Sequence, residues 1–149
     1  MTSMQDALMM DDFDEAMRLI EAGGNPDEED HRDGGTILLR AVVEGRNDAV
    51  KFLLNKKVNV NKQDKNGVSA LHMAAIHARA DIAKTLLENG AEVEIQDGRG
   101  ATAFAHSISQ IGRENIRTAK ILISHGADIN FMTKSGVALV DVLGLRDKL

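Results

Sequence analysis

The chain has 149 residues, the size of one domain, and its hydrophobic content of 43% is sufficient for a buried core. It contains no cysteine, which excludes disulfides, thiol nucleophiles and thiolate metal sites. The net charge is −5 and no segment has the length and apolarity of a membrane span, so the sequence favours neither nucleic acid nor a membrane as a partner.

Segment 1–30 of the chain is strongly acidic. It contains ten acids and one basic residue, Arg18, so it carries a charge of −9 and the rest of the chain carries +4. An acidic end on a mildly basic body can steer a basic partner, and it is also typical of a solvated outer face. The segment lacks the basic and apolar parts of a secretory signal, and we therefore expect a cytoplasmic protein.

Residues 1–34 are expected to form two helices. The first spans residues 4–10 and the second spans residues 13–22. Gly23 follows the second helix, and a glycine there tolerates the left-handed backbone that ends a helix. Five of the seven methionines lie between Met1 and Met17, where they either fill gaps or form an adaptable binding surface.

Residues 35–66 repeat this pattern, with helices expected near residues 36–44 and 48–56. Lys57 takes the place that a glycine has in the other units, so the sequence predicts a lysine with left-handed backbone. A side chain in that conformation costs on the order of 1 kcal/mol relative to glycine. We therefore expect this position to be strained.

Residues 67–99 are the most regular unit. Ser69 is placed to cap a helix that runs through residue 76. A second helix over residues 81–89 carries Ile82, Leu86 and Leu87 on one face, and a glycine ends it. A helix pair this short cannot bury its apolar face alone, so copies must stack.

Residues 100–135 form a fourth, longer unit. The turn glycine recurs at Gly100, one repeat period after its counterpart at Gly67, but the glycine that ends the second helix, Gly126, comes three positions later than that period predicts. We place the three additional residues in a loop between two helices, over residues 107–115. Such an insertion either extends a binding surface or is a tolerated surface loop.

Three of the units share a signature at the start of the first helix. It reads Thr36-Ile37-Leu38-Leu39-Arg40-Ala41, Ser69-Ala70-Leu71-His72-Met73-Ala74 and Thr102-Ala103-Phe104-Ala105-His106-Ser107. With the 33-residue period, these segments make the sequence similar to the ankyrin-repeat family, whose signature is T-P-L-H-x-A. The chain departs from that family in lacking the signature proline, in having the signature histidine only at His72, and in having Lys57 in place of a glycine.

The resemblance implies an all-α fold, an ankyrin-repeat solenoid of stacked helix-turn-helix units with hairpin-like loops. It implies a single domain over residues 1–149. The expected parts are four repeats at about 1–34, 35–66, 67–99 and 100–135, and a C-terminal cap at 136–149 that contains a helix over 138–143.

No catalytic or metal-binding pattern is present in the sequence. The five histidines have no metal-ligand spacing, and the resemblance makes His72 a structural, hydrogen-bonding residue. Ser69 lacks the second glycine of a nucleophile elbow, and the glycines at 98 and 100 do not complete a phosphate-binding motif. We therefore expect no enzyme activity, no metal and no cofactor.

A basic residue recurs just before the turn glycine of each repeat. A rigid stack would align these residues, and the resemblance places them, with the exposed ends of the first helices, on a concave groove that usually binds proteins. The predicted partner-binding residues are Arg32, Asp33, Glu44, Lys65, Asn66, His77, Arg99, Gln110, Arg113, Met132 and Lys134. A merely solvated row is the alternative. Arg99 is the expected centre, because arginine can form bidentate contacts to carboxylates.

The predicted function is that of a non-enzymatic module, a monomer on its own, that binds another protein through its concave face. A stack of this size can act as a small cytoplasmic inhibitor, for instance an immunity protein against a toxin enzyme. A regulatory adaptor, a scaffold subunit or a structural oligomerising unit is the alternative.

Overall fold

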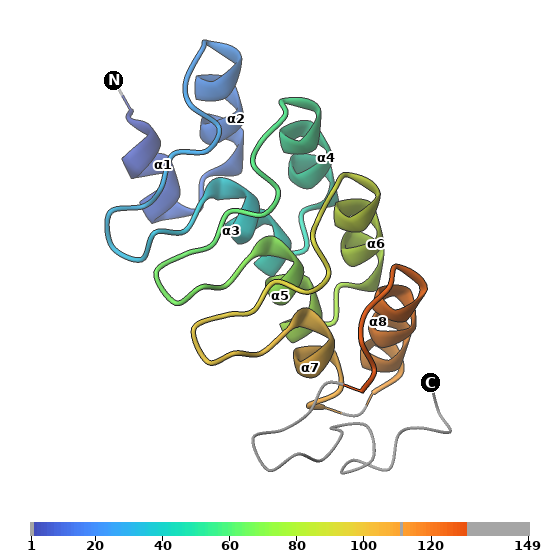
Figure 1. Ribbon diagram of the computed structural model, residues 1–149. Coiled ribbons are helices and arrows are strands. Elements are labelled where there is room, and N and C mark those ends of the chain that lie inside the picture. The colour runs from blue at the N-terminus through green and yellow to red at the C-terminus, as the bar shows by residue number, and fades with distance from the viewer. Residues whose placement is uncertain (1, 111, 131–149) are drawn as a thin grey trace.

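The computed structural model describes residues 2–110 and 112–130, a part of the chain that contains helices and no strands (Figure 1). The helices are α1 (Met4–Met10), α2 (Phe13–Glu21), α3 (Ile37–Val43), α4 (Asn47–Asn55), α5 (Ala70–Ile76), α6 (Ala80–Glu88), α7 (Ala103–Ser107) and α8 (Arg113–Ser124). The expected cap at 136–149, its helix over 138–143 and the predicted contact residues Met132 and Lys134 lie outside the described residues.

The helices form pairs that stack along one direction (Figure 1). The first helices of the units, α1, α3, α5 and α7, form one layer, the second helices form another, and the loops between units project away from both layers. Because α5 packs against α7 and α6 packs against α8, consecutive units contact each other through both helices. The expected all-α solenoid of stacked helix pairs is confirmed.

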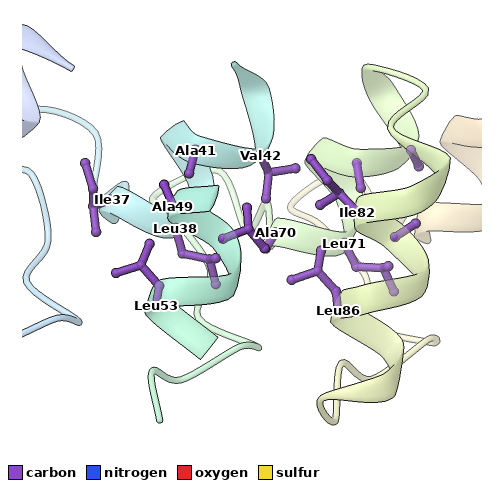
Figure 2. Packing of buried hydrophobic residues seen from close by; sticks show 14 of the residues in the cluster. Ile37, Leu38, Ala41, Val42, Ala49, Leu53, Ala70, Leu71, Ile82 and Leu86 are labelled. Atoms are coloured by element: carbon purple, nitrogen blue, oxygen red, sulfur yellow. The ribbon is translucent and has the colours of Figure 1, made fainter. Parts of the chain in front are cut away.

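One apolar core runs through the stack (Figure 2). Leu53 of α4 and Leu86 of α6 are fully buried at the same position of successive units. Ala41 and Ala74 are fully buried on the first helices, where their small side chains let neighbouring helices approach closely. The core is therefore made of repeated contacts between units and has no single centre.

A hydroxyl side chain caps the first helix of every unit. The side chains of Ser3, Thr36, Ser69 and Thr102 each accept a hydrogen bond from the amide three residues further along. These bonds satisfy donors that a helix start leaves free. The predicted cap at Ser69 is confirmed, and it belongs to the repeat.

The expected left-handed lysine is also confirmed. Lys57 has a φ of 58°, and Gly23, Gly90 and Gly126 end their helices with φ of 100°, 93° and 96°. A β carbon in this region approaches the following carbonyl, which glycine avoids. Lys57 is thus the one strained residue among these four helix ends.

The insertion in the fourth unit lies mainly in a helix. The second helix of this unit, α8, has 12 residues where α6 of the preceding unit has 9, so the three additional residues lengthen the helix. Gly112 precedes it with extended backbone, and Glu114 places an acid in the first turn, which favours a helix start. The predicted loop over residues 107–115 is too long, because Ser107 ends α7 and α8 already begins at Arg113. The expected longer connection is present, since five residues separate α7 from α8 where three separate α5 from α6.

Replacing Lys57 with glycine should stabilise the protein by about 0.5–1 kcal/mol, because relief of the left-handed lysine exceeds the added entropy of the unfolded chain. The midpoint of chemical denaturation measures the change. Lys56→Gly is the control, since Lys56 has a φ of −86° and its ammonium lies 3.0 Å from Glu21. We expect the control to be less stable than the wild type. A Lys57→Gly midpoint at or below that of the wild type would contradict the assigned strain.

Damage to the core of one unit should spread to the next. Leu86 is fully buried, and Leu86→Ala should cost about 2–5 kcal/mol. Because α6 packs against α8, hydrogen exchange should show reduced protection in α8 as well as in α6. Lys84→Ala, on the exposed side of α6, should leave both helices protected. Loss of protection in α6 alone would mean that the units are not coupled.

Candidate protein-binding face

Backbone hydrogen bonds join consecutive loops of the stack. The amide of Lys65 donates to the carbonyl of Asp33 at 2.9 Å, and the amide of Gly98 donates to the carbonyl of Asn66 at 2.8 Å. A β carbon at Gly67 would lie 2.7 Å from the nitrogen of Gly98, so no side chain fits there. The loops are therefore held at a fixed separation.

A buried carboxylate holds the loop between the third and fourth units. Asp97 Oδ1 accepts hydrogen bonds from the amides of Arg99 at 2.9 Å and Ala101 at 3.0 Å, and Oδ2 accepts from His106 Nε2 at 2.8 Å. Burial alone would raise the pKa of Asp97, but these hydrogen bonds outweigh it and lower the pKa below its ordinary value. The charged carboxylate thus keeps the loop in shape.

His72 links the third unit to the fourth. Its Nδ1 accepts a hydrogen bond from the amide of Ser69 at 3.1 Å, and its Nε2 lies 2.9 Å from the carbonyl oxygen of Ala101. A neutral ring with its proton on Nε2 satisfies both contacts. Burial lowers the pKa of His72, so this neutral form is present at pH 7.

The loop between the first two units is held by a buried carboxylate. Asp30 Oδ2 lies 2.6 Å from Arg32 and 2.7 Å from Arg40, and the Asp30 side chain is only 3% exposed. Hydrogen bonds from Arg32 hold the pKa of Asp30 well below its ordinary value, although burial opposes them. Arg32, a predicted contact residue, is therefore already engaged within its own chain.

All nine predicted contact residues that the structure describes are exposed. The loops carry Arg32, Asp33, Lys65, Asn66 and Arg99, the ends of the first helices carry Glu44 and His77, Gln110 follows α7, and Arg113 begins α8. We call the surface formed by the loops and the exposed ends of α3, α5 and α7 the loop face.

The first hollow in the loop face is acidic. It has a volume of about 100 Å³, and Leu39, Val43 and Met73 form its apolar wall. Its charged lining comes from Asp11, Asp33, Glu44, Asp64 and Arg40. The structure thus brings together two of the predicted residues, Asp33 and Glu44.

The second hollow in the loop face has a basic rim. It has a volume of about 490 Å³ and is lined by Lys65, Asn66, Val68, Ile76, Asp97, Gly98, Arg99 and His106. Ile76 is 38% exposed, and the guanidinium of Arg99 pairs with no acid in the part of the chain that the structure describes. The ammonium of Lys65, in contrast, donates to the carbonyl of His31 at 2.9 Å. Arg99 is therefore the cation most available to a partner.

Four predicted residues line neither of these hollows, and Arg32, which is held by Asp30, is one of them. His77 and Gln110 are exposed but line neither hollow. Arg113 lies on the second helices, where it lines a separate hollow with Lys84 of α6. Arg113 begins α8, so the structure places it apart from the two loop-face hollows, and its contact with a partner stays a prediction.

A protein-family model described as ankyrin repeats (3 copies) matches residues 4–97. The chain belongs to the ankyrin-repeat family. The match covers the first three units, and α7 and α8 continue the same packing beyond it. A search of curated proteins found no match. Ankyrin repeats indicate a protein–protein interaction module.

The ankyrin stack shows no metal site within residues 2–110 and 112–130, where no group of three or more His, Cys, Asp or Glu side chains could hold an ion. No helix in these ranges is long and apolar enough to span a membrane. Ser69 and His72 contact each other, but both are buried and serve the helix cap.

Among the residues that line the loop-face hollows and were not predicted, three share one position of the repeat. Arg40, Met73 and His106 occupy the fifth position of the ankyrin signature in successive repeats. Their spacing of one repeat period is visible in the sequence, and so is the variety of their side chains. A position whose side chain differs from repeat to repeat, within a signature that otherwise recurs, could have indicated a binding surface.

Acidification should destabilise the protein through His72. Burial lowers its folded pKa below the ordinary value of 6.5, so the unfolded state binds a proton more readily. The contribution of neutral His72 to the free energy of unfolding should therefore be complete above pH 6.5 and should decrease as the pH falls below it. Urea denaturation at about pH 7 and about pH 5.5 measures the change, before the loop carboxylates protonate.

His72→Gln should be less stable at neutral pH but should show a smaller difference between the two pH values. His125→Gln is the control, because His125 is exposed and should keep the wild-type dependence. An identical pH dependence in His72→Gln and the wild type would contradict the role of His72.

Proposed function

We propose that the chain binds a partner protein through its loop face. The observation that carries the proposal is the hollow of about 490 Å³, where the exposed Ile76 lies among Lys65, Arg99 and His106. Binding hot spots combine a desolvated apolar contact with arginine or aromatic anchors. The chain has no tryptophan or tyrosine, so arginine and aliphatic side chains must supply such anchors here.

The rigidity of the loops supports this proposal. Hydrogen bonds from Lys65 to Asp33 and from Gly98 to Asn66 hold the loops in place before any partner arrives. A surface that is already ordered loses less conformational entropy on binding, which favours affinity.

The charges of the two hollows suggest how a partner would be oriented. The first hollow is rich in carboxylates and the second has a basic rim. Complementary charge fixes the register of an interface and rejects the reversed arrangement. The partner would therefore place a basic segment over the first units and an acidic segment over the last loops.

We propose an inhibitor as the biological role, for instance an immunity protein whose loop face covers the active site of a toxin enzyme. Steric cover by a rigid face is sufficient for inhibition. An adaptor or scaffold subunit would use the same face without blocking activity. An activity assay of the isolated partner, with and without the chain, separates the two roles.

Arg99→Glu should weaken partner binding by more than tenfold, which corresponds to about 1.4 kcal/mol. The reversal removes the cation that is most available in the larger hollow and adds a repulsive charge. A pull-down with the wild-type chain identifies the partner, and titration calorimetry then measures the affinity of each variant.

Lys51→Glu on α4 is the matched control, because it makes the same charge change on an exposed site of the second helices. It should leave the affinity within about threefold of the wild type, since only long-range attraction changes. Equal losses in both variants would mean that net charge alone drives binding. A loss confined to Lys51→Glu would place the interface on the second helices.

A further inference from the structure

The second helices form a hollow of about 650 Å³ between α6 and α8. Its lining includes Lys84, Arg113, Ile116, Arg117, Lys120 and Ile121. None of these residues belongs to the loop face, so the hollow is a separate surface of the molecule.

The hollow carries uncompensated positive charge. Arg117 is paired, with Asp81 at 2.5 Å and Glu114 at 3.3 Å. Lys84, Arg113 and Lys120 form no ion pair with any residue in the described ranges. The hollow therefore favours an acidic occupant. The carboxylates of that occupant would lose water on docking, and pairing with these cations would offset that cost.

The same hollow has an apolar component. Ile116 and Ile121 line it and are half-buried, so part of their side chains contacts solvent. The inserted helical turn of the fourth unit supplies Arg113 at one edge. An occupant that fits this surface would present apolar side chains surrounded by acids.

The first unit of the chain has that chemistry. Among the described residues, the large apolar side chains that are exposed are Ile76, Met9 and Met10, and the two methionines are 53% and 74% exposed on the last turn of α1. Segment 1–30 contains ten acids, and exposed Asp11 and Asp12 follow the methionines directly. Methionine side chains adapt readily to an irregular apolar surface.

One molecule cannot use both surfaces on itself. α1 and α8 lie at opposite ends of the stack (Figure 1). We propose that the acidic first unit of one copy docks, through Met9 and Met10, into the basic hollow between α6 and α8 of a second copy. This head-to-tail contact is heterologous, so it builds rings or open chains instead of a symmetric pair.

The purified full chain tests this proposal by sedimentation velocity over a wide range of concentrations at low and high salt. We expect association that grows with concentration and is weakened at least about tenfold by high salt, because exposed charges are screened. A wild-type chain that stays monomeric under all these conditions would overturn the proposal. It would overturn it even if the hollow bound an acidic segment of another protein instead.

Two double variants locate the contact. Lys84→Glu with Lys120→Glu alters the hollow, and Met9→Lys with Met10→Lys alters the first unit, all at exposed positions. Each should abolish self-association, while Lys51→Glu on α4 should retain it. Circular dichroism verifies that the variants are folded.

Mixing the two double variants gives the decisive result. Each retains one intact surface, so the mixture should form a heterodimer of one copy of each that does not grow further. Self-association that persists in either variant, or a mixture that stays monomeric while the wild type associates, would refute the head-to-tail contact.

Discussion

No unit of this protein can bury its own apolar side, and stacking on a neighbour is the condition on which the whole structure depends. Leu53, Leu86 and Leu122 are fully buried at the same position of α4, α6 and α8. Each of these side chains belongs to one cluster that extends through all four units. Because the same contact recurs, the core also determines where each loop lies relative to the next. The exposed surface thus inherits its regular spacing from the interior.

Much of the fold could be predicted from residues with clear local chemistry. Capping hydroxyls and helix-ending glycines placed the helices between residues 4 and 89 to within one residue. The position of the insertion was predicted wrongly because the spacing of Gly90 and Gly126 shows only how many residues were added. It does not show which helix or loop contains them. Left-handed residues between the helices of a unit, at Asp11 and Ala78, were missed because neither is a glycine.

The repeat pattern predicted that the site residues are exposed, but it did not predict which residues of the chain they pair with. Arg32 and Arg99 both precede a turn glycine, yet only the guanidinium of Arg32 pairs with a buried carboxylate. The residue at the fifth signature position affects the charge of each hollow, because it either pairs with a loop carboxylate or leaves it without an ion pair. Arg40 pairs with Asp30 and His106 with Asp97, whereas Met73 and Asp64 line the first hollow together and form no such pair. Pairings of this kind depend on side-chain direction, which a one-dimensional pattern does not contain.

The contact between neighbouring loops has a geometric consequence for the whole loop face. The bond from Gly98 to Asn66 sets the spacing of two units on the loop side, while helix packing sets it on the other side. The difference between these two spacings determines how strongly the stack curves. Gly67, where a β carbon would push the loops apart, therefore controls curvature. A substitution there would reshape the surface presented to a partner without replacing any residue that touches it.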